Sequence, residues 1–266
     1  MEFLNELKIN QDEIIVIAGP TASGKTDLSI KTALKFNGEV ISADSRQIYR
    51  GLDIGSAKIT KQEMCGVPHH LIDILEPGEK YSVAQFQADT LSLIKDIQSR
   101  GKIPIICGGT GLYIESVVER YQFSDSGRKS KLKAGYNPKF KVYLLQWPRD
   151  VLRERISLRV DQRMEQGMLE EAQNLIDAGV DPQWLISLGL EYKYLTEYLL
   201  GSGTLTDEQK DAELQECITK LKFKIYQFAK RQDTWFRRWS YAKEIRMGEN
   251  RLQWPPSHSP STAARK

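Results

Sequence analysis

One segment near the N-terminus constrains the fold of this chain more than any other. A strand-like run, Glu13–Ala18, leads directly into the octet Gly-Pro-Thr-Ala-Ser-Gly-Lys-Thr at positions 19–26, and an amphipathic stretch follows it. The octet fits the P-loop pattern G-x-x-x-x-G-K-[ST], which needs a strand before it and a helix after it. The sequence therefore predicts a strand–loop–helix unit that binds a phosphorylated ligand.

The residue types of the octet suit a di- or triphosphate. A glycine-rich backbone exposes a row of N–H groups, and the start of the following helix adds its positive end. Lys25 would neutralise phosphate oxygens, and the Thr26 hydroxyl would hold Mg²⁺. We expect the whole octet to form the phosphate-binding site: Gly19, Pro20, Thr21, Ala22, Ser23, Gly24, Lys25 and Thr26.

Strand and helix signals alternate through the first half of the chain. Strands are expected at 14–18, 39–42, 70–74, 103–107 and 140–146, and helices at 26–36 and 82–100, the second opened by a capping box from Ser82 to Gln85. From residue 149 the signals are mainly helical, at 149–166, 169–177, 190–200 and 206–231. We expect an α/β fold, a P-loop NTPase-like three-layer sandwich with a mostly parallel sheet and a helical C-terminal half.

The 266 residues are expected to form one P-loop α/β domain, 1–248, followed by a disordered, low-complexity tail, 249–266. Within the domain, 122–139 is a short basic loop in place of the usual insertion, with 124–138 expected to be mobile. The sequence has no apolar run long enough to cross a bilayer, and its acidic, polar start is not a signal peptide, so a cytoplasmic location is expected.

Cysteine and histidine usage gives no sign of a metal centre. Cys65, Cys107 and Cys217 are scattered singly, against both a disulfide framework and a zinc site. The adjacent His69 and His70 follow a proline, and we expect them to shape a loop rather than to bind metal.

The net charge of +3 does not by itself indicate nucleic acid, but basic residues gather in 128–163 and 220–243. Aromatic residues are interleaved in the second stretch, a combination that suits single-stranded or looped RNA. The alternative is a solvated helix face over a packed aromatic core.

A second constellation, 41–55, follows the second expected strand. Asp44 would stand at the C-terminal end of that strand, where such sheets build their active sites. Its carboxylate could bind Mg²⁺ through water or accept a proton from a nucleophile. The alternative is that Asp44 caps the following turn.

Taken together, these motifs resemble the tRNA dimethylallyltransferase (isopentenyltransferase) family. The matching segments occur in the family's order across most of the chain, at 19–26, 42–55, 67–73, 81–86, 103–113 and 230–237. The resemblance implies transfer of a dimethylallyl group from its diphosphate to the exocyclic amino group of an adenine. In tRNA this is the adenine 3′ of the anticodon, in tRNAs that read codons beginning with U.

The resemblance also assigns roles to residues. The P-loop would hold the diphosphate of the isoprenoid donor, with Mg²⁺ on Thr26 and a water-mediated contact to Asp44 as the further option. Asp44 would take up the proton of the acceptor amine, and Arg159 would contact the diphosphate, so Asp44, Thr26 and Arg159 are the expected catalytic residues. Gly108, Gly109 and Thr110 would complete the channel, with Thr21 and Ser23. The residues expected to contact the tRNA anticodon loop are Ser45, Arg46, Gln47, Tyr113, Lys230, Arg231, Gln232 and Trp235. A monomer is expected.

The chain also departs from the family. Tyr121 reaches Phe140 through a short loop, where bacterial members carry a helical insertion that grips the anticodon stem-loop. The segment 187–193 is altered, and the cysteine/histidine finger of eukaryotic members is missing. Three hypotheses follow: a compact tRNA-modifying transferase, an isopentenyltransferase acting on free adenine nucleotides, and a P-loop kinase of a small metabolite. The 230–237 segment favours the first.

Overall fold

The computed structural model describes residues 7–123, 129–131, 139–204 and 206–248. A six-stranded sheet forms its centre, in the order β3-β2-β4-β1-β7-β8, and every pair of neighbouring strands is parallel. The strands are β1 (Glu13–Ala18), β2 (Gly38–Ala43), β3 (His69–His70), β4 (Ile103–Gly108), β7 (Lys139–Gln146) and β8 (Lys243–Arg246). The parallel α/β class predicted from the alternating signals is confirmed.

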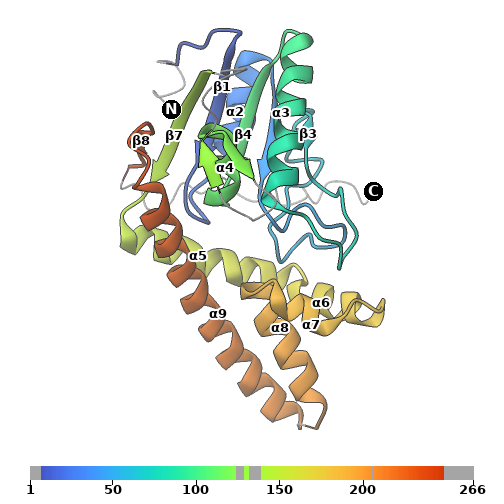
Figure 1. The fold of residues 1–266 in the computed structure, drawn as a ribbon. Coiled ribbons are helices and arrows are strands. Elements are labelled where there is room, and N and C mark those ends of the chain that lie inside the picture. The colour runs from blue at the N-terminus through green and yellow to red at the C-terminus, as the bar shows by residue number, and fades with distance from the viewer. Residues whose placement is uncertain (1–6, 124–128, 132–138, 205, 249–266) are drawn as a thin grey trace, which may run out of the picture.

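Side-chain alternation along β1 divides the core into two layers. Ile14 and Val16 face α3 (Val83–Ser99) and α4 (Gly111–Val118), while Ile15 and Ile17 face α2 (Lys25–Phe36). Because both faces of a parallel sheet are covered, its strands are apolar throughout. Figure 1 shows the resulting three layers, with α2 and α3 flanking the sheet.

The ends of the helices follow local sequence signals. Ser82 and Gln85 form the expected capping box at the start of α3. Gly24 adopts a left-handed conformation (φ 88°) immediately before α2, and Asn37 (φ 52°) ends that helix in the same way. The P-loop therefore passes directly into a helix, as its pattern requires.

The C-terminal half is helical and lies beyond one end of the sheet (Figure 1). Its helices are α5 (Arg149–Glu165), α6 (Met168–Asp177), α7 (Pro182–Ser187), α8 (Leu190–Gly201) and α9 (Asp207–Phe236), with a 3₁₀ turn at Ser202–Thr204. A core of their own, including Ile156, Leu195 and Leu221, holds α5, α6, α8 and α9 together, and Leu185 of α7 packs in a separate cluster with Tyr192 of α8. α9 returns to the sheet, where Phe236 packs against the α3–α4 layer.

Several elements differ from the sequence expectation. The third strand is confined to His69–His70, because Leu71 and Asp73 have positive φ angles that end it. α7 and the edge strand β8 were not predicted, and α9 continues to Phe236 rather than ending at residue 231. Within the expected basic loop, β5 (Tyr121–Phe123) pairs antiparallel with β6 (Lys129–Lys131). The rest of that loop and the expected tail lie outside the described residues.

In the part of the chain that the structure describes, no helix combines the length and apolar character needed to span a membrane.

Candidate active site

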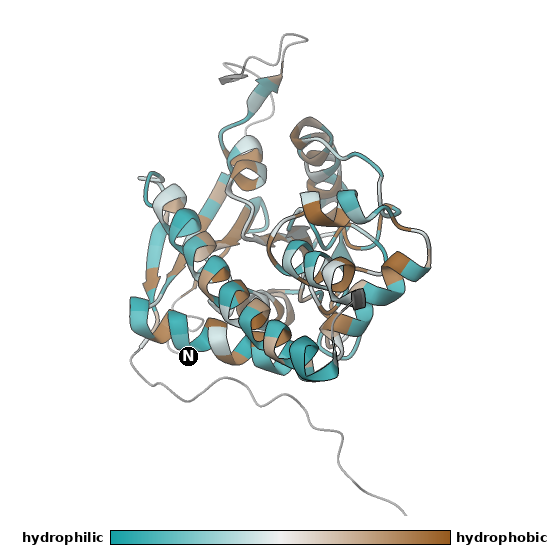
Figure 2. Ribbon diagram, turned by 90° about the horizontal axis from the view of Figure 1, so that it is seen from below, coloured by the Kyte–Doolittle hydropathy of each residue, from teal (hydrophilic) through white to brown (hydrophobic). Residues whose placement is uncertain are grey.

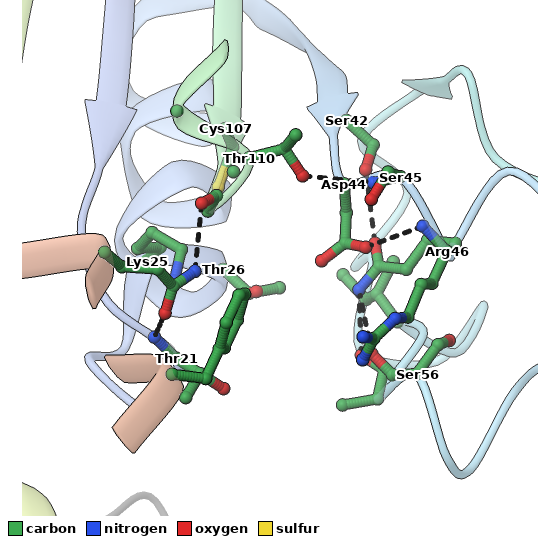
Figure 3. Close-up of a pocket in the computed structure, with 18 of the residues that line it drawn as sticks. Thr21, Lys25, Thr26, Ser42, Asp44, Ser45, Arg46, Ser56, Cys107 and Thr110 are labelled. Carbon is green, nitrogen blue, oxygen red and sulfur yellow. Dashed lines mark hydrogen bonds between the residues drawn. The ribbon is translucent and has the colours of Figure 1, made fainter. Parts of the chain in front are cut away.

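A cavity of about 510 Å³ lies between the C-terminal ends of the central strands and the helical half. Figure 3 shows its two walls: Thr21, Lys25 and Thr26 on one side, and Asp44–Arg46 on the other. Gly108–Thr110, Arg159 and α9 complete the lining. The motifs predicted to act together do converge on this one space, as expected for the strand ends of a parallel sheet.

The P-loop presents a buried cation to the cavity. Lys25 Nζ donates a hydrogen bond of 2.7 Å to the carbonyl of Pro20. Burial lowers the pKa of Lys25 to about 8, because a desolvated ammonium is costly. A bound anion would restore the lost solvation, so Lys25 is poised for a phosphate ligand.

Three residues of the octet, Gly19, Ala22 and Ser23, shape or anchor the P-loop and do not line the cavity. A Cβ on Gly19 would lie 3.0 Å from the carbonyl oxygen of Leu145, so the loop can approach β7 only with glycine there. Ser23, expected to line the channel, is instead fully buried beneath the loop, outside the cavity lining. The carbonyls of Ala22 and Ser23 accept hydrogen bonds from Arg155 Nε and Trp147 Nε1, both at 2.8 Å.

Asp44 follows β2 directly and stands across the cavity from Lys25 (Figure 3). Its Oδ1 accepts a 2.9 Å hydrogen bond from the backbone N–H of Arg46, so it does cap the turn. The same carboxylate also lines the cavity. The capping and catalytic interpretations are therefore compatible: the turn holds the carboxylate where a nucleophile would meet it.

The turn after β4 links both walls. The Thr110 hydroxyl accepts a 3.2 Å hydrogen bond from the N–H of Ser45. A Cβ on Gly108 would lie 2.1 Å from the carbonyl oxygen of Ala43, so this close passage requires glycine. From α9, Gln232 Nε2 donates to the Gly109 carbonyl at 2.9 Å, and its Oε1 accepts from the Thr21 N–H at 2.9 Å. Gln232 thus joins the P-loop to the turn.

Three arginines one helical turn apart on α5 have different surroundings. Arg155 bonds the P-loop and stacks on Trp147 at 4.3 Å, and Arg163 bonds Gly55 and Glu191. Arg159 lines the cavity, and no hydrogen bond or ion pair links it to another described residue. Burial and the neighbouring guanidinium of Arg163 lower the pKa of Arg159. An unpaired buried guanidinium is a site for an anion, which agrees with the predicted diphosphate contact.

Two carboxylates that the sequence did not point to, the buried Glu191 and the half-buried Glu171, hold the Asp44 loop on the helical half. Glu191 Oε2 lies 3.3 Å from Arg46, and Glu191 Oε1 lies 3.1 Å from Arg163. Glu171 accepts hydrogen bonds from the backbone N–H groups of Asp53, Ile54 and Gly55 at 2.6–2.9 Å. The contacts of Glu171 and Glu191 with the Asp44 loop join segments more than a hundred residues apart and carry no local sequence signal.

The residues expected to contact tRNA fall into distinct positions. Six of them line the cavity, and Lys230 lines an adjoining depression on α9; the six are Ser45, Arg46, Gln47, Arg231, Gln232 and Trp235. The Arg46 guanidinium is bonded to Glu191 and, at 2.6 Å, to the Leu188 carbonyl, while the amide of Gln47 bonds the Ala57 carbonyl at 3.1 Å.

Tyr113 belongs to the core rather than to the cavity. It is 7% exposed and stacks on Phe86, with ring centroids 4.3 Å apart. This burial argues against a direct contact between its ring and RNA. Like Gln232, it fixes elements of the site from inside the fold.

The residues that line the cavity fit Mg²⁺ through oxygen ligands. The Thr26 hydroxyl and the Asp44 carboxylate both border it, and oxygen donors are those that Mg²⁺ prefers. Two protein ligands match an ion that retains water and binds substrate phosphate. Among the described residues no group of three or more His, Cys, Asp and Glu could form a metal site by itself. His70 instead bonds Glu39 at 2.8 Å.

The site combines three features: a P-loop with a buried lysine, an unpaired arginine, and a carboxylate that faces them. Together they define a class of protein that binds a phosphorylated substrate and activates a nucleophile beside it. Comparison with known proteins specifies the family. The family model described as IPP transferase matches residues 47–141 and 122–239. This chain belongs to that family.

Curated and solved relatives agree. A Shewanella sediminis protein named tRNA dimethylallyltransferase 2 is 39% identical over 277 residues, covering 85% of this chain and 89% of that protein. The aligned stretch exceeds the 266 residues of this chain, so the relative carries residues that this chain lacks.

The structure of a tRNA isopentenylpyrophosphate transferase from Bacillus halodurans has a TM-score of 0.76 at 36% identity, covering 88% of this chain and 90% of that one. A eukaryotic dimethylallyltransferase acting on tRNA has a TM-score of 0.71 at 26% identity, covering 84% and 69%.

Proposed function

We propose that this chain transfers a dimethylallyl group from dimethylallyl diphosphate to the exocyclic amino group of an adenine in tRNA. The acceptor we propose is the adenine 3′ of the anticodon, in tRNAs that read codons beginning with U. The observation that carries this proposal is one cavity with buried cations on one wall and a carboxylate facing them. Relatives named for this reaction support it.

The cationic wall suits the departing diphosphate. As the allylic C–O bond breaks, negative charge develops on the diphosphate, and Lys25, Arg159 and the P-loop N–H groups stabilise it. Mg²⁺ held by Thr26, with Asp44 through water, would supply additional charge neutralisation. Because Lys25 and Arg159 are already buried, they need no reorganisation when the charge forms.

The facing wall suits the acceptor. The adenine nitrogen forms a bond to the allylic carbon and loses a proton, which the Asp44 carboxylate accepts. The N–H of Arg46 and the anchored loop fix that carboxylate in place. The products are a prenylated adenine, diphosphate and a protonated Asp44 that returns its proton to water.

Transfer to free adenine nucleotides is the second candidate, since the aligned stretch of the relative carries residues that this chain lacks. Radiolabelled dimethylallyl diphosphate offered to tRNA and AMP in parallel separates the two. We expect label in tRNA alone, and label in AMP alone would reject the tRNA acceptor. ATP consumption without isoprenoid transfer would instead indicate the kinase.

A tRNA substrate also implies where and how the chain works. We propose that it acts in the cytoplasm, where tRNA is used, and as a monomer. Sedimentation of the purified protein tests the second point, and a dimer mass would reject it.

A further inference from the structure

The long helix α9 carries a polar, basic stripe along one face. Residues spaced by three and four positions lie on the same side of a helix. Here that spacing collects Lys220, Lys224, Gln227, Arg231 and Thr234, and Arg238 follows in the turn just beyond the helix. At about 1.5 Å per residue the helical part of the stripe is roughly 21 Å long. In Figure 2, teal and brown segments alternate along α9, as expected for a helix that buries only one side.

The cations of the stripe are poorly neutralised. In the part of the chain that the structure describes, no carboxylate forms an ion pair with Lys220, Lys224 or Arg231. Lys220 lies over the Tyr194 ring at 5.7 Å, and Arg238 is 3.7 Å from Glu115. Two basic residues outside the stripe are paired: Lys222 bonds Asp161 at 2.6 Å, and Arg237, at the C-cap, bonds Asp233 at 2.5 Å. Lys230 lies over the Tyr226 ring at 5.8 Å. Most of the α9 cations without a carboxylate partner therefore belong to the stripe.

The stripe is continuous with the active site. Arg231 and Trp235 line both the catalytic cavity and a second depression, whose other lining residues include Gln227, Lys230 and Arg238. The Arg238 guanidinium stacks on the Trp235 ring at 4.1 Å. The Trp235 ring is half-buried, and cationic residues beside a partly accessible aromatic ring suit the phosphates and bases of RNA. From this depression the stripe continues away from the cavity towards Lys220.

We propose that the α9 stripe holds the phosphate backbone of the RNA stem whose loop delivers the adenine to the cavity. This inference rests on the proposed function and adds a surface beyond the reacting groups. A polyanion matches the row of unpaired cations, and one end of the stripe borders the depression that adjoins the cavity. The stripe adds a contact surface for RNA outside the active-site motifs.

The Lys220→Ala/Lys224→Ala double variant tests this surface without touching the cavity lining. We expect the Kd for an anticodon stem-loop RNA and the KM for tRNA to rise roughly tenfold. The slope of log K against log salt should fall by about two units, one for each phosphate contact. The kcat and the KM for dimethylallyl diphosphate should stay at wild-type values. Lys220→Arg/Lys224→Arg should restore RNA binding.

The matched control is Lys31→Ala/Lys35→Ala on α2. That helix packs against the sheet face opposite to the one that Phe236 of α9 packs against, and the control removes the same charge. It should bind RNA like the wild type. An α9 variant with wild-type Kd and salt slope would overturn the proposed surface, even if tRNA were modified. Conversely, RNA binding that depends on Lys220 and Lys224 without any transfer would refute the function and leave the surface standing.

Discussion

At the scale of single residues, the site is built from charges that are partly unsatisfied in the free protein. Lys25 has one carbonyl partner, and Arg159 has no bonded partner among the described residues. Burial of these groups opposes folding and favours anion binding, so stability and ligand affinity should change in opposite directions when they are removed.

The Lys25→Met variant tests this trade. In the folded wild-type protein the pKa of Lys25 is about 8, below the ordinary 10.5, so its buried charge lowers stability at pH 7. Removing the charge should stabilise the ligand-free protein by on the order of 2 kcal/mol. This gain exceeds the roughly 1 kcal/mol lost with the hydrogen bond to the Pro20 carbonyl. The gain should shrink as the pH rises from about 8 towards 10.5, where wild-type Lys25 is neutral in both states. Urea unfolding at several pH values measures it.

The same variant should lose the thermal stabilisation that added diphosphate gives the wild type. Equal stabilisation of both proteins by diphosphate would show that Lys25 is not its ligand.

Asp44→Asn tests the proton acceptor. The amide keeps the shape of the side chain and its acceptor oxygen for the Arg46 N–H but cannot take up the proton. We expect turnover to fall by about 10²-fold or more, with donor Kd within a few fold of the wild-type value. Single-turnover assays and donor titration measure the two quantities. A variant with near-normal turnover would remove Asp44 from this role.

At the scale of elements, the loop that carries Asp44 has little regular structure and is fixed by the helical half. Glu171 and Glu191 reach it from α6 and α8, and Arg163 reaches it from α5. Charged groups buried this deeply contribute mainly by fixing one arrangement, because their desolvation offsets much of their attraction.

Replacing Glu191 by Gln should destabilise the fold by about 3–5 kcal/mol, since Arg163 then stays buried with an uncompensated charge. Chemical unfolding measures the loss. The matched control is Glu197→Gln on the same helix, an exposed residue 3.7 Å from Lys193, which should cost less than about 0.5 kcal/mol. Similar losses in both variants would contradict the anchoring role of Glu191.

At the scale of the whole molecule, local sequence signals predicted many of the strands and helices. The run 13–26 predicted β1, the P-loop and the start of α2, and the capping box at Ser82 predicted where α3 begins. Asp44 and Gly108–Thr110 meet because β2 and β4 are neighbours, and the family motifs indicated that meeting without revealing the strand order.

What the sequence could not reveal depends on contacts between distant segments. Gln232 bonds Thr21 across 211 positions, and Arg46 is held by Glu191 across 145 positions. Ser23 and Tyr113 match the family motifs yet are buried, because a motif records residue types and not the direction of each side chain. Such directions are set by tertiary packing.

The most direct test of the account is the stoichiometry of a single reaction. Purified protein, dimethylallyl diphosphate, Mg²⁺ and unmodified tRNA are mixed with ATP present, and diphosphate, ADP and modified nucleoside are quantified together. We predict one diphosphate released for each dimethylallyl adenine formed in tRNA, with ATP unchanged. Conversion of ATP to ADP with no prenylated adenine would contradict the account.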